Sequence, residues 1–291
     1  MTGTRVVTAL VLIPIVIGIV LFTPTWVVAV ALAAITILAL REYFALGDAI
    51  GHRAYRLWTI FCALILIAAQ CKPVVLDLMG VNVEPTVSSA RLHDLLSNLF
   101  SPTTVFFLFV LGLACLTLWT RRPLVESLPS AGISSSAVLL VAFPLSFAVR
   151  LHGIPTFGPR LLLFALAITW AADTVAYFVG RAIGMHPLAP HISPKKTWEG
   201  SIGGLAGSLL VAYGFHFWLT ISLPHLLAMA TLGNIAGQMG DLLESACKRS
   251  AGVKDSGGLL PGHGGVLDRI DALILCIPVI WYYLVLVNPH L

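Results

Sequence analysis

Charged side chains are scarce in this sequence. Asp, Glu, Lys and Arg together make up only 10 % of its 291 residues, whereas a soluble domain carries about 25 % and depends on them for solubility. Hydrophobic residues reach 58 %, so we expect most of the surface to face lipid rather than water. The shortage of charge therefore excludes an ordinary soluble protein.

Two further absences narrow the possible functions. The five cysteines show no C-x-x-C spacing, which argues against a disulfide framework or a cysteine-based zinc site. No basic stripe with interleaved aromatic residues accompanies the net charge of +4, so we expect no nucleic-acid partner. The excess positive charge is expected beside anionic lipid headgroups of a bilayer instead.

What the sequence does contain is a series of apolar runs. A transmembrane helix needs roughly 20 such residues, and the pattern predicts an all-α integral membrane protein, a polytopic bundle of about nine transmembrane helices. The first run is expected to stay as a signal-anchor, because only a three-residue turn separates it from the second. The nine predicted spans are Arg5–Phe22, Trp26–Leu46, Leu57–Cys71, Thr103–Thr120, Ala131–Val149, Leu161–Val179, Ser201–Ile221, Leu226–Gly240 and Ile270–Val287.

Lysine and arginine placement predicts the orientation. With the N-terminus in the cytoplasm, 13 of the 17 basic residues fall in cytoplasmic segments and four on the opposite side, as the positive-inside rule requires. We expect an N-terminal region, 1–150, with about five spans, and a C-terminal transmembrane region, 151–291. The latter region holds two cytoplasmic loops, 181–200 and 241–271.

The sixth predicted span carries an acid near its cytoplasmic end. A carboxylate at membrane depth costs a few kcal/mol even on the lenient insertion scale, so Asp173 needs a reason to be there. It could be satisfied structurally by a neighbouring helix, or it could contact a ligand or metal, which we favour. Tyr177 and Arg181 follow at helical spacing and are expected on the same face.

The stretch HISPKKTWEG, residues 191–200, suggests an anion site. Ser193 followed by Pro194 is typical of a helix cap and first helical position, which would place Lys195, Lys196 and Thr197 in the first turn. Two lysines there disfavour the helix end unless an anion such as phosphate is bound. The alternative is a basic pair that contacts bulk lipid. Four glycines that follow, at 200, 203, 204 and 207, are explained by close helix packing.

The segment 241–271 concentrates charge and glycine. If the eighth span continues past Gly240 as a helix, Asp241, Glu244, Ser245 and Lys248 form one polar stripe. The glycines after it break regular structure and allow close approach of a ligand to the backbone.

Carboxylates in this segment predict a cation. Two of them 4 Å apart repel by about 4 kcal/mol at an effective dielectric of 20, so Asp241 and Asp268, with Asp271 or Glu244, call for a metal between them. All-oxygen ligands favour Mg²⁺, and basic residues around it would form a polyphosphate cradle. The alternative is a set of salt-bridged loops that brace helix ends. The basic residues in question are Lys248, Arg249, Lys254 and Arg269.

The same residues carry a family resemblance. The run from Ser245 through Lys248-Arg249, Lys254-Asp255 and His263-Gly264-Gly265 to Asp268-Arg269-Ile270-Asp271 resembles the signature of the phosphatidate cytidylyltransferases, also called CDP-diglyceride synthetases. The stretches around Asp173 and from Ser193 to Gly200 support it, so the match extends over residues 170–271. The N-terminal half agrees only in its multi-span hydrophobicity.

The resemblance implies a reaction and its participants. Phosphatidate would attack the α-phosphorus of CTP, releasing pyrophosphate and forming CDP-diacylglycerol, with Mg²⁺ held by Asp241 and Asp268 and room for a second, monovalent cation. It also implies a multi-pass protein of the bacterial inner membrane, with the site facing the cytoplasm, and suggests a homodimer. The expected catalytic residues are Asp241, Asp268, Lys248, Arg249 and Asp271. The expected substrate contacts are Asp173, Ser193, Lys195, Lys196, Thr197, Glu199, Glu244, Ser245, Lys254, Asp255, His263, Gly264, Gly265 and Arg269.

Two other functions remain open. An ion-coupled transporter could use acids such as Asp173 and Asp241 to carry cations, although the charges gather at one face and no matched halves occur. A related nucleotidyltransferase could act on a different lipid phosphate with the same 241–271 motif. For the cytidylyltransferase we expect a cavity open sideways to the inner leaflet, because pulling both acyl chains out of lipid would cost on the order of 25 kcal/mol.

Overall fold

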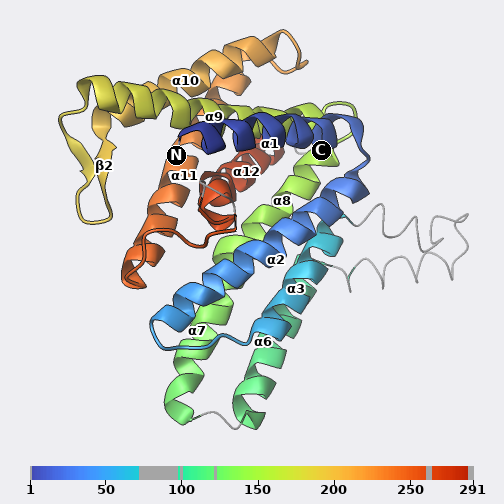
Figure 1. Ribbon diagram of the computed structural model, residues 1–291. Coiled ribbons are helices and arrows are strands. Elements are labelled where there is room, and N and C mark those ends of the chain that lie inside the picture. The colour runs from blue at the N-terminus through green and yellow to red at the C-terminus, as the bar shows by residue number, and fades with distance from the viewer. Residues whose placement is uncertain (1, 72–97, 99–100, 121–122, 260–263, 288–291) are drawn as a thin grey trace, which may run out of the picture.

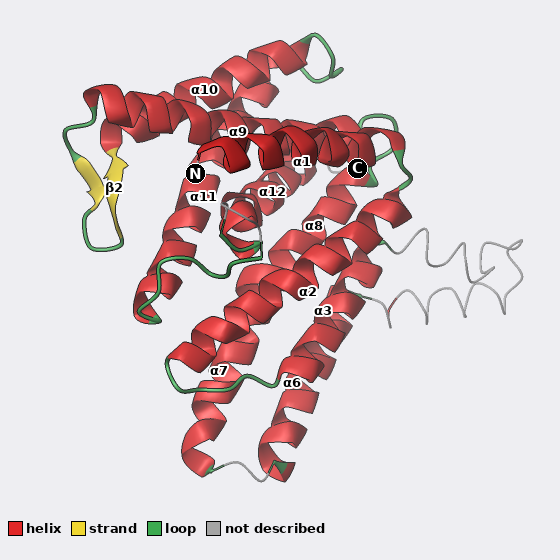
Figure 2. Ribbon diagram, viewed as in Figure 1, coloured by secondary structure: helices red, strands yellow, loops and turns green. Residues whose placement is uncertain are grey.

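The computed structural model describes residues 2–71, 98, 101–120, 123–259 and 264–287 (Figures 1 and 2). Most of this part of the chain is helical. The elements are α1 (Thr2–Phe22), α2 (Thr25–Ala49), α3 (Arg56–Gln70), α6 (Pro102–Trp119), η1 (Leu124–Glu126), α7 (Ser127–Ala137), the π-helix η2 (Val138–Ala142), α8 (Phe143–His152), α9 (Gly158–Ile183), β1 (Pro187–Ala189), β2 (Ser193–Thr197), α10 (Trp198–His216), α11 (Leu223–Ser250) and α12 (Leu267–Val287).

Each of the nine predicted spans coincides with a helix, which confirms the all-α membrane bundle. In the described part of the chain, five helical segments are long and apolar enough to cross a bilayer: α2, α6, the run Leu124–His152, α9 and α12. The run Leu124–His152 changes to π-helix at Val138–Ala142 before continuing as α8. Shorter apolar helices cover Leu10–Phe22 and Arg56–Gln70.

One hydrophobic core joins both halves of the chain. Buried residues from α2 and α8, such as Leu40 and Phe147, belong to the same cluster as Phe164 of α9 and Ile280 of α12. In Figure 1, α8 and α12 lie near the centre of the bundle, with α2 in front and α10 at the upper edge. The division of the chain at residue 150 stays a prediction.

Glycines set the contact between α9 and α10. A Cβ on Gly203 would lie 2.8 Å from Val179 and one on Gly207 2.8 Å from Val175, while Gly204 faces the backbone oxygen of Ala172. Helices that meet through such small residues approach closely. The packing interpretation of this glycine face is confirmed, and the contact holds the part of α9 around Asp173 against Gly204 and Gly207 of α10.

The N-terminus of α10 differs from the prediction. Ser193–Thr197 forms a strand that pairs antiparallel with Pro187–Ala189, so Ser193 is no helix cap and the two lysines lie on a strand. The cap is Thr197, whose hydroxyl accepts from the backbone N–H of Gly200 at 3.1 Å. The Ser-Pro pattern was misleading because a proline also suits the beginning of an edge strand.

Glu199 closes the hairpin that β1 and β2 form. Its carboxylate accepts hydrogen bonds from the backbone N–H groups of Met185 and His186 and pairs with the His186 ring. The hydrogen bond to His186, with these backbone contacts, lowers the pKa of Glu199 to about 2. An ionised acid in the first turn of α10 also suits the helix dipole.

Candidate active site

A cavity of about 780 Å³ lies where α9, the hairpin, α10, α11 and α12 meet. Ten of the predicted site residues line it: Asp173, Lys195, Lys196, Thr197, Asp241, Lys248, Asp255, Asp268, Arg269 and Asp271. Residues 173 and 271 are almost one hundred positions apart, so the fold brings together segments that sequence alone places far from one another. The cavity also has an apolar side, with Ala172, Ala176 and Leu188.

Three carboxylates from different helices line this cavity: Asp173 of α9, Asp241 of α11 and Asp271 of α12. The negative charge of Asp241 acts on both Asp173 and Asp271, because like charges on neighbouring helices repel each other. Gly240 permits the approach of α11 to α12, because a Cβ there would collide with the backbone oxygen of Asp271. Asp241 itself pairs with Lys196 of β2, and both side chains are a little over one quarter exposed.

Asp268 occupies a second, more enclosed cluster. Its carboxylate accepts from the Lys248 ammonium at 2.6 Å and from the backbone N–H groups of Ser256 at 3.1 Å and Gly265 at 2.8 Å. Lys248 also pairs with Glu244 one helical turn earlier. The two clusters thus place the basic groups of Lys196 and Lys248 beside acids that line the cavity.

Burial and ion pairing change the pKa values of Glu244 and Lys248, which lie near the C-terminal end of α11. Burial is the main cause that raises the pKa of Glu244 to about 7, against the opposing effect of Lys248. For Lys248, burial would lower the pKa, but the hydrogen bonds to Asp268 and Glu244 outweigh it and the pKa rises. Lys248 therefore stays charged between two acids, of which Glu244 is the more easily protonated.

On α9, Asp173, Tyr177 and Arg181 all line the cavity, which confirms that they share one face of the helix. The Arg181 guanidinium donates to the Tyr177 hydroxyl at 3.1 Å. This row of polar side chains runs from the acid toward the hairpin. It gives α9 a polar side at the cavity, whereas apolar residues such as Phe164 and Ile168 belong to the bundle core.

Other predicted residues support the cavity from outside its lining. Arg249 donates to the backbone oxygens of Ile192 and Val253 and so braces the hairpin against α11. Gly264 has a positive φ of 79° and faces the Asp268 carboxylate, which favours glycine. His263 is outside the described residues. The predicted residues that lie outside the lining are Ser193, Glu199, Glu244, Ser245, Arg249, Lys254, Gly264 and Gly265.

Sequence reasoning missed Glu42, which reaches the site from α2. One carboxylate oxygen accepts from the backbone N–H of Val266 at 2.9 Å. The other accepts from the N–H of Leu267 at 2.8 Å and from the Ser256 hydroxyl at 3.1 Å. These N–H groups lie at the start of α12 and have no partner inside the helix. The available signal was an Arg41-Glu42 pair within an apolar run, where a charge is rarely placed without a function.

Glu42 also explains two glycines of the 251–266 loop. A Cβ on Gly257 would lie 2.6 Å from one carboxylate oxygen of Glu42, and a Cβ on Gly265 would collide with the other. Real Cβ atoms essentially never come so close. The two positions therefore need glycine so that the α2 carboxylate can approach the loop.

A second missed feature is a polar network between the cavity walls. Gln238 of α11 pairs with Ser201 of α10 and donates to Asn234 at 2.6 Å. Asn234 donates in turn to Ser208 at 3.0 Å, and Ser208 to the backbone oxygen of Ile168 in α9 at 2.9 Å. Because buried polar groups are costly unless they are paired, this chain of bonds fixes the three helices in register.

Comparison with known proteins supplies the family. A model described as the cytidylyltransferase family matches residues 3–287. The chain belongs to this family.

The relatives of this chain include three bacterial proteins named phosphatidate cytidylyltransferase. The one from Bacillus subtilis is 35 % identical over 178 residues, 60 % of this chain and 66 % of the relative. That from Haemophilus influenzae is 41 % identical over 174 residues, 57 % and 59 % of the two chains. That from Staphylococcus haemolyticus is 43 % identical over 150 residues, 51 % and 56 %. The matched segments thus cover less than two thirds of each relative.

The donor chemistry of this family member fits a hard divalent cation at Asp241. Its carboxylate is partly exposed in the cavity, and the repulsion from Asp173 and Asp271 is what a cation would relieve. No group of three or more His, Cys, Asp or Glu residues in the described ranges is already arranged as a metal site. Asp268 is held by Lys248 and backbone N–H groups, so its role as a metal ligand stays a prediction.

Proposed function

We propose that this chain transfers a cytidylyl group from CTP to phosphatidate, which forms CDP-diacylglycerol and releases pyrophosphate. The observation that supports this best is the cavity where carboxylates and basic groups meet at the end of a membrane bundle. The relatives named phosphatidate cytidylyltransferase favour CTP and phosphatidate as the pair of substrates.

In the proposed reaction, a phosphate oxygen of phosphatidate attacks the α-phosphorus of CTP. A new P–O bond forms there, and the bond from the α-phosphorus to the oxygen bridging to the β-phosphorus breaks, so that pyrophosphate leaves with the electron pair. The nucleophile is already anionic, so no general base is needed. The residues have to position two anions and neutralise their charge.

The basic residues of the cavity are suited to that task. Lys195 and Lys196 project from the hairpin strand, and Arg269 follows Asp268 at the start of α12. We assign these residues, with Lys248, to the phosphate groups of the two substrates. Mg²⁺ held by Asp241 and Asp268 would supply further charge neutralisation for the polyphosphate, as cations do in phosphoryl transfer.

We place the protein in the bacterial inner membrane with the cavity facing the cytoplasm. The distribution of 13 basic residues against four supports this orientation, and CTP is then available from that side. The apolar side of the cavity, with Ala172 and Ala176, suits a sideways path for the acyl chains. Assembly as a homodimer stays a prediction.

Pyrophosphate release by the purified full chain in detergent tests the proposal. We expect release that requires CTP, phosphatidate and Mg²⁺ together, and a loss of about 10²–10³-fold in kcat for Asp241→Asn, since removal of one preorganised charge stabiliser costs this much. Arg160→Gln is a matched control, because Arg160 contacts Trp218 and does not line the cavity.

Each other outcome would identify a rival. Activity on an archaeal-type ether lipid phosphate without activity on phosphatidate would favour the related nucleotidyltransferase. Cation flux in proteoliposomes without pyrophosphate release would favour the ion-coupled transporter. An Asp268→Asn variant with full activity would refute the assignment of Asp268 to the metal.

A further inference from the structure

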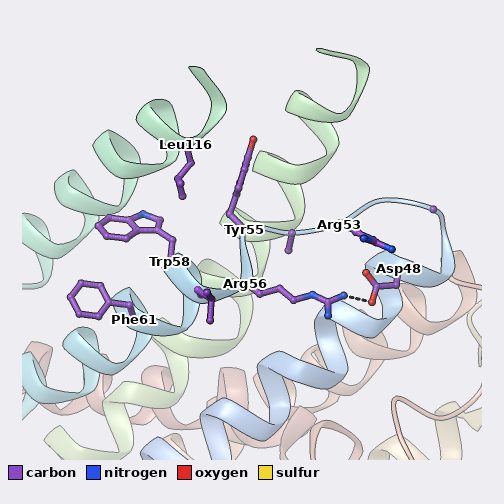
Figure 3. Close-up of a pocket in the computed structure, with 10 residues that line it drawn as sticks. Asp48, Arg53, Tyr55, Arg56, Trp58, Phe61 and Leu116 are labelled. Carbon is purple, nitrogen blue, oxygen red and sulfur yellow. Dashed lines mark hydrogen bonds and ion pairs between the residues drawn. The ribbon is translucent and has the colours of Figure 1, made fainter. Parts of the chain in front are cut away.

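A second and larger cavity, of about 1150 Å³, lies at the turn between α2 and α3 (Figure 3). Its lining includes Asp48 of α2, Arg53 of the turn, and Arg56 and Phe61 of α3, with Leu116 of α6 on the far side. No lining residue is shared with the cavity of the candidate active site. A ligand here would therefore be separate from the substrates proposed above.

One end of this cavity is cationic. Arg56 pairs with Asp48, and the two side chains remain 46 % and 40 % exposed. Figure 3 shows the Arg53 and Arg56 side chains on the same side of the cavity as Asp48, so two guanidinium groups and one carboxylate face this end. The planar donor fork of arginine matches a phosphate group, and an exposed ion pair of this kind exchanges partners at little cost.

The other end is apolar and preformed. The Trp58 indole N–H donates to the backbone oxygen of Phe109 in α6 at 3.1 Å. The Trp58 and Phe61 rings are tilted by 32°, with their centroids 5.6 Å apart. Gly112 of α6 lets the indole lie against the helix, because a Cβ there would collide with the ring. Phe61 is 53 % exposed, which leaves an aromatic wall open toward the lipid.

The position of the cavity along the bundle fits a membrane interface. Arg56 begins α3, an apolar helix, so its guanidinium group lies at the end of a span and Phe61 lies between one and two turns further into it. Glu42 lies less than two helical turns before Asp48 on α2, and its carboxylate contacts Ser256 and Leu267 beside the candidate active site. The cavity thus opens at the same end of the bundle as the candidate active site.

We infer that this cavity binds a diacyl phospholipid with an anionic headgroup. Its phosphate would lie at Arg53 and Arg56, and one acyl chain would follow Phe61 and Leu116. Basic pockets between transmembrane helices recognise anionic headgroups in this way. A soluble phosphate would leave the aromatic wall unused, and a zwitterionic lipid would bring a cation toward two arginines.

The test uses the purified full chain in detergent with dioleoyl phosphatidylglycerol, and dioleoyl phosphatidylcholine for comparison. A photoreactive diazirine on the phosphatidylglycerol acyl chain reports the location, through cross-linked peptides, and native mass spectrometry reports retention. We expect cross-links in 57–61 and around Leu116. Arg53→Gln with Arg56→Gln should weaken cross-linking at these positions about 30-fold, from about fivefold for each charge near an anionic headgroup.

Two further variants make the result interpretable. Asp48→Asn should strengthen phosphatidylglycerol cross-linking several-fold by releasing Arg56, and a gain cannot come from misfolding. Arg41→Gln is the matched control, because Arg41 is exposed on α2 and lines neither cavity. The inference is overturned if cross-links appear only in the walls of the other cavity, if phosphatidylcholine binds equally, or if Asp48→Asn changes nothing.

Discussion

Glu42 offers the sharpest test of how the two halves of the chain cooperate. Its carboxylate holds the N–H groups of Val266 and Leu267 and the hydroxyl of Ser256. Asp268, the second residue of α12, takes its position from this segment. Glu42→Gln keeps the shape of the side chain but removes its charge and turns an amide N–H toward a backbone donor.

The expected decrease in kcat for Glu42→Gln follows from the hydrogen bonds that are lost. A hydrogen bond to a charged group contributes about 1.5–3 kcal/mol, and Glu42→Gln loses at least one of the two backbone contacts. If that loss falls on the geometry of the transition state, kcat decreases roughly 10- to 150-fold, at 1.36 kcal/mol for each factor of ten. KM for CTP should change less than threefold, because Glu42 does not line the cavity.

A double-mutant cycle separates positioning from general destabilisation. Gly265→Ala places a methyl group against the Glu42 carboxylate and should lower kcat on its own. In a Glu42→Ala background the added methyl group no longer collides with a carboxylate. The effects of the two substitutions on kcat should therefore be coupled by about 1 kcal/mol or more. Both are measured by pyrophosphate release, with thermal unfolding in detergent followed in parallel.

Glu126→Gln provides the matched control for Glu42. Glu126 is another carboxylate of the N-terminal half, and it pairs with His52 at 3.2 Å away from the loop. It should leave kcat unchanged within twofold. A Glu42→Gln protein with wild-type kcat, or fully additive effects of Glu42→Ala and Gly265→Ala, would refute the positioning role.

Three other substitutions address α11 and α12. Gly240→Ala puts a methyl group into the backbone oxygen of Asp271 and should lower the unfolding temperature by several degrees, as overpacking costs about 1–3 kcal/mol. Lys248→Met leaves Glu244 and Asp268 without their shared cation and should destabilise by about 3–5 kcal/mol, measured by the same thermal assay. Burial raises the pKa of Glu244 to about 7, above its ordinary value, so its ionisation destabilises the fold as the pH rises from about 4.5 past 7. Glu244→Gln should therefore flatten the dependence of unfolding temperature on pH over this range, and an unchanged slope would contradict the assignment.

The helices could be predicted from the sequence because a bilayer permits few backbone structures. Apolar runs such as 103–120 and 270–287 must be helical, since lipid offers no partner for an open backbone. The hairpin could not be predicted in the same way. Ser193 and Pro194 satisfy the rules for a helix cap and equally suit an edge strand, and the pairing with Pro187–Ala189 decides between them.

The candidate site was predictable where its residues cluster in the chain. Asp241 and Asp268 belong to one charged, glycine-rich segment, and the lysines of 195–196 follow a recognisable pattern. Glu42 lies 214 positions before Ser256, so no local spacing connects the two. The sequence shows that residues 257 and 265 are glycines but does not explain why. The explanation is the close approach of the Glu42 carboxylate, which depends on the packing of α2 against the loop.

The need for Glu42 follows from where α12 begins. Its first N–H groups lie at the end of an apolar span, next to buried residues such as Val266 and Leu267, where water cannot satisfy them cheaply. Asp268 already accepts the N–H of Gly265, and an acid from another helix has to take the next two. Residues 151–291 contain no other described partner for these groups. The boundary at residue 150 therefore separates two stretches of sequence, while the site depends on both.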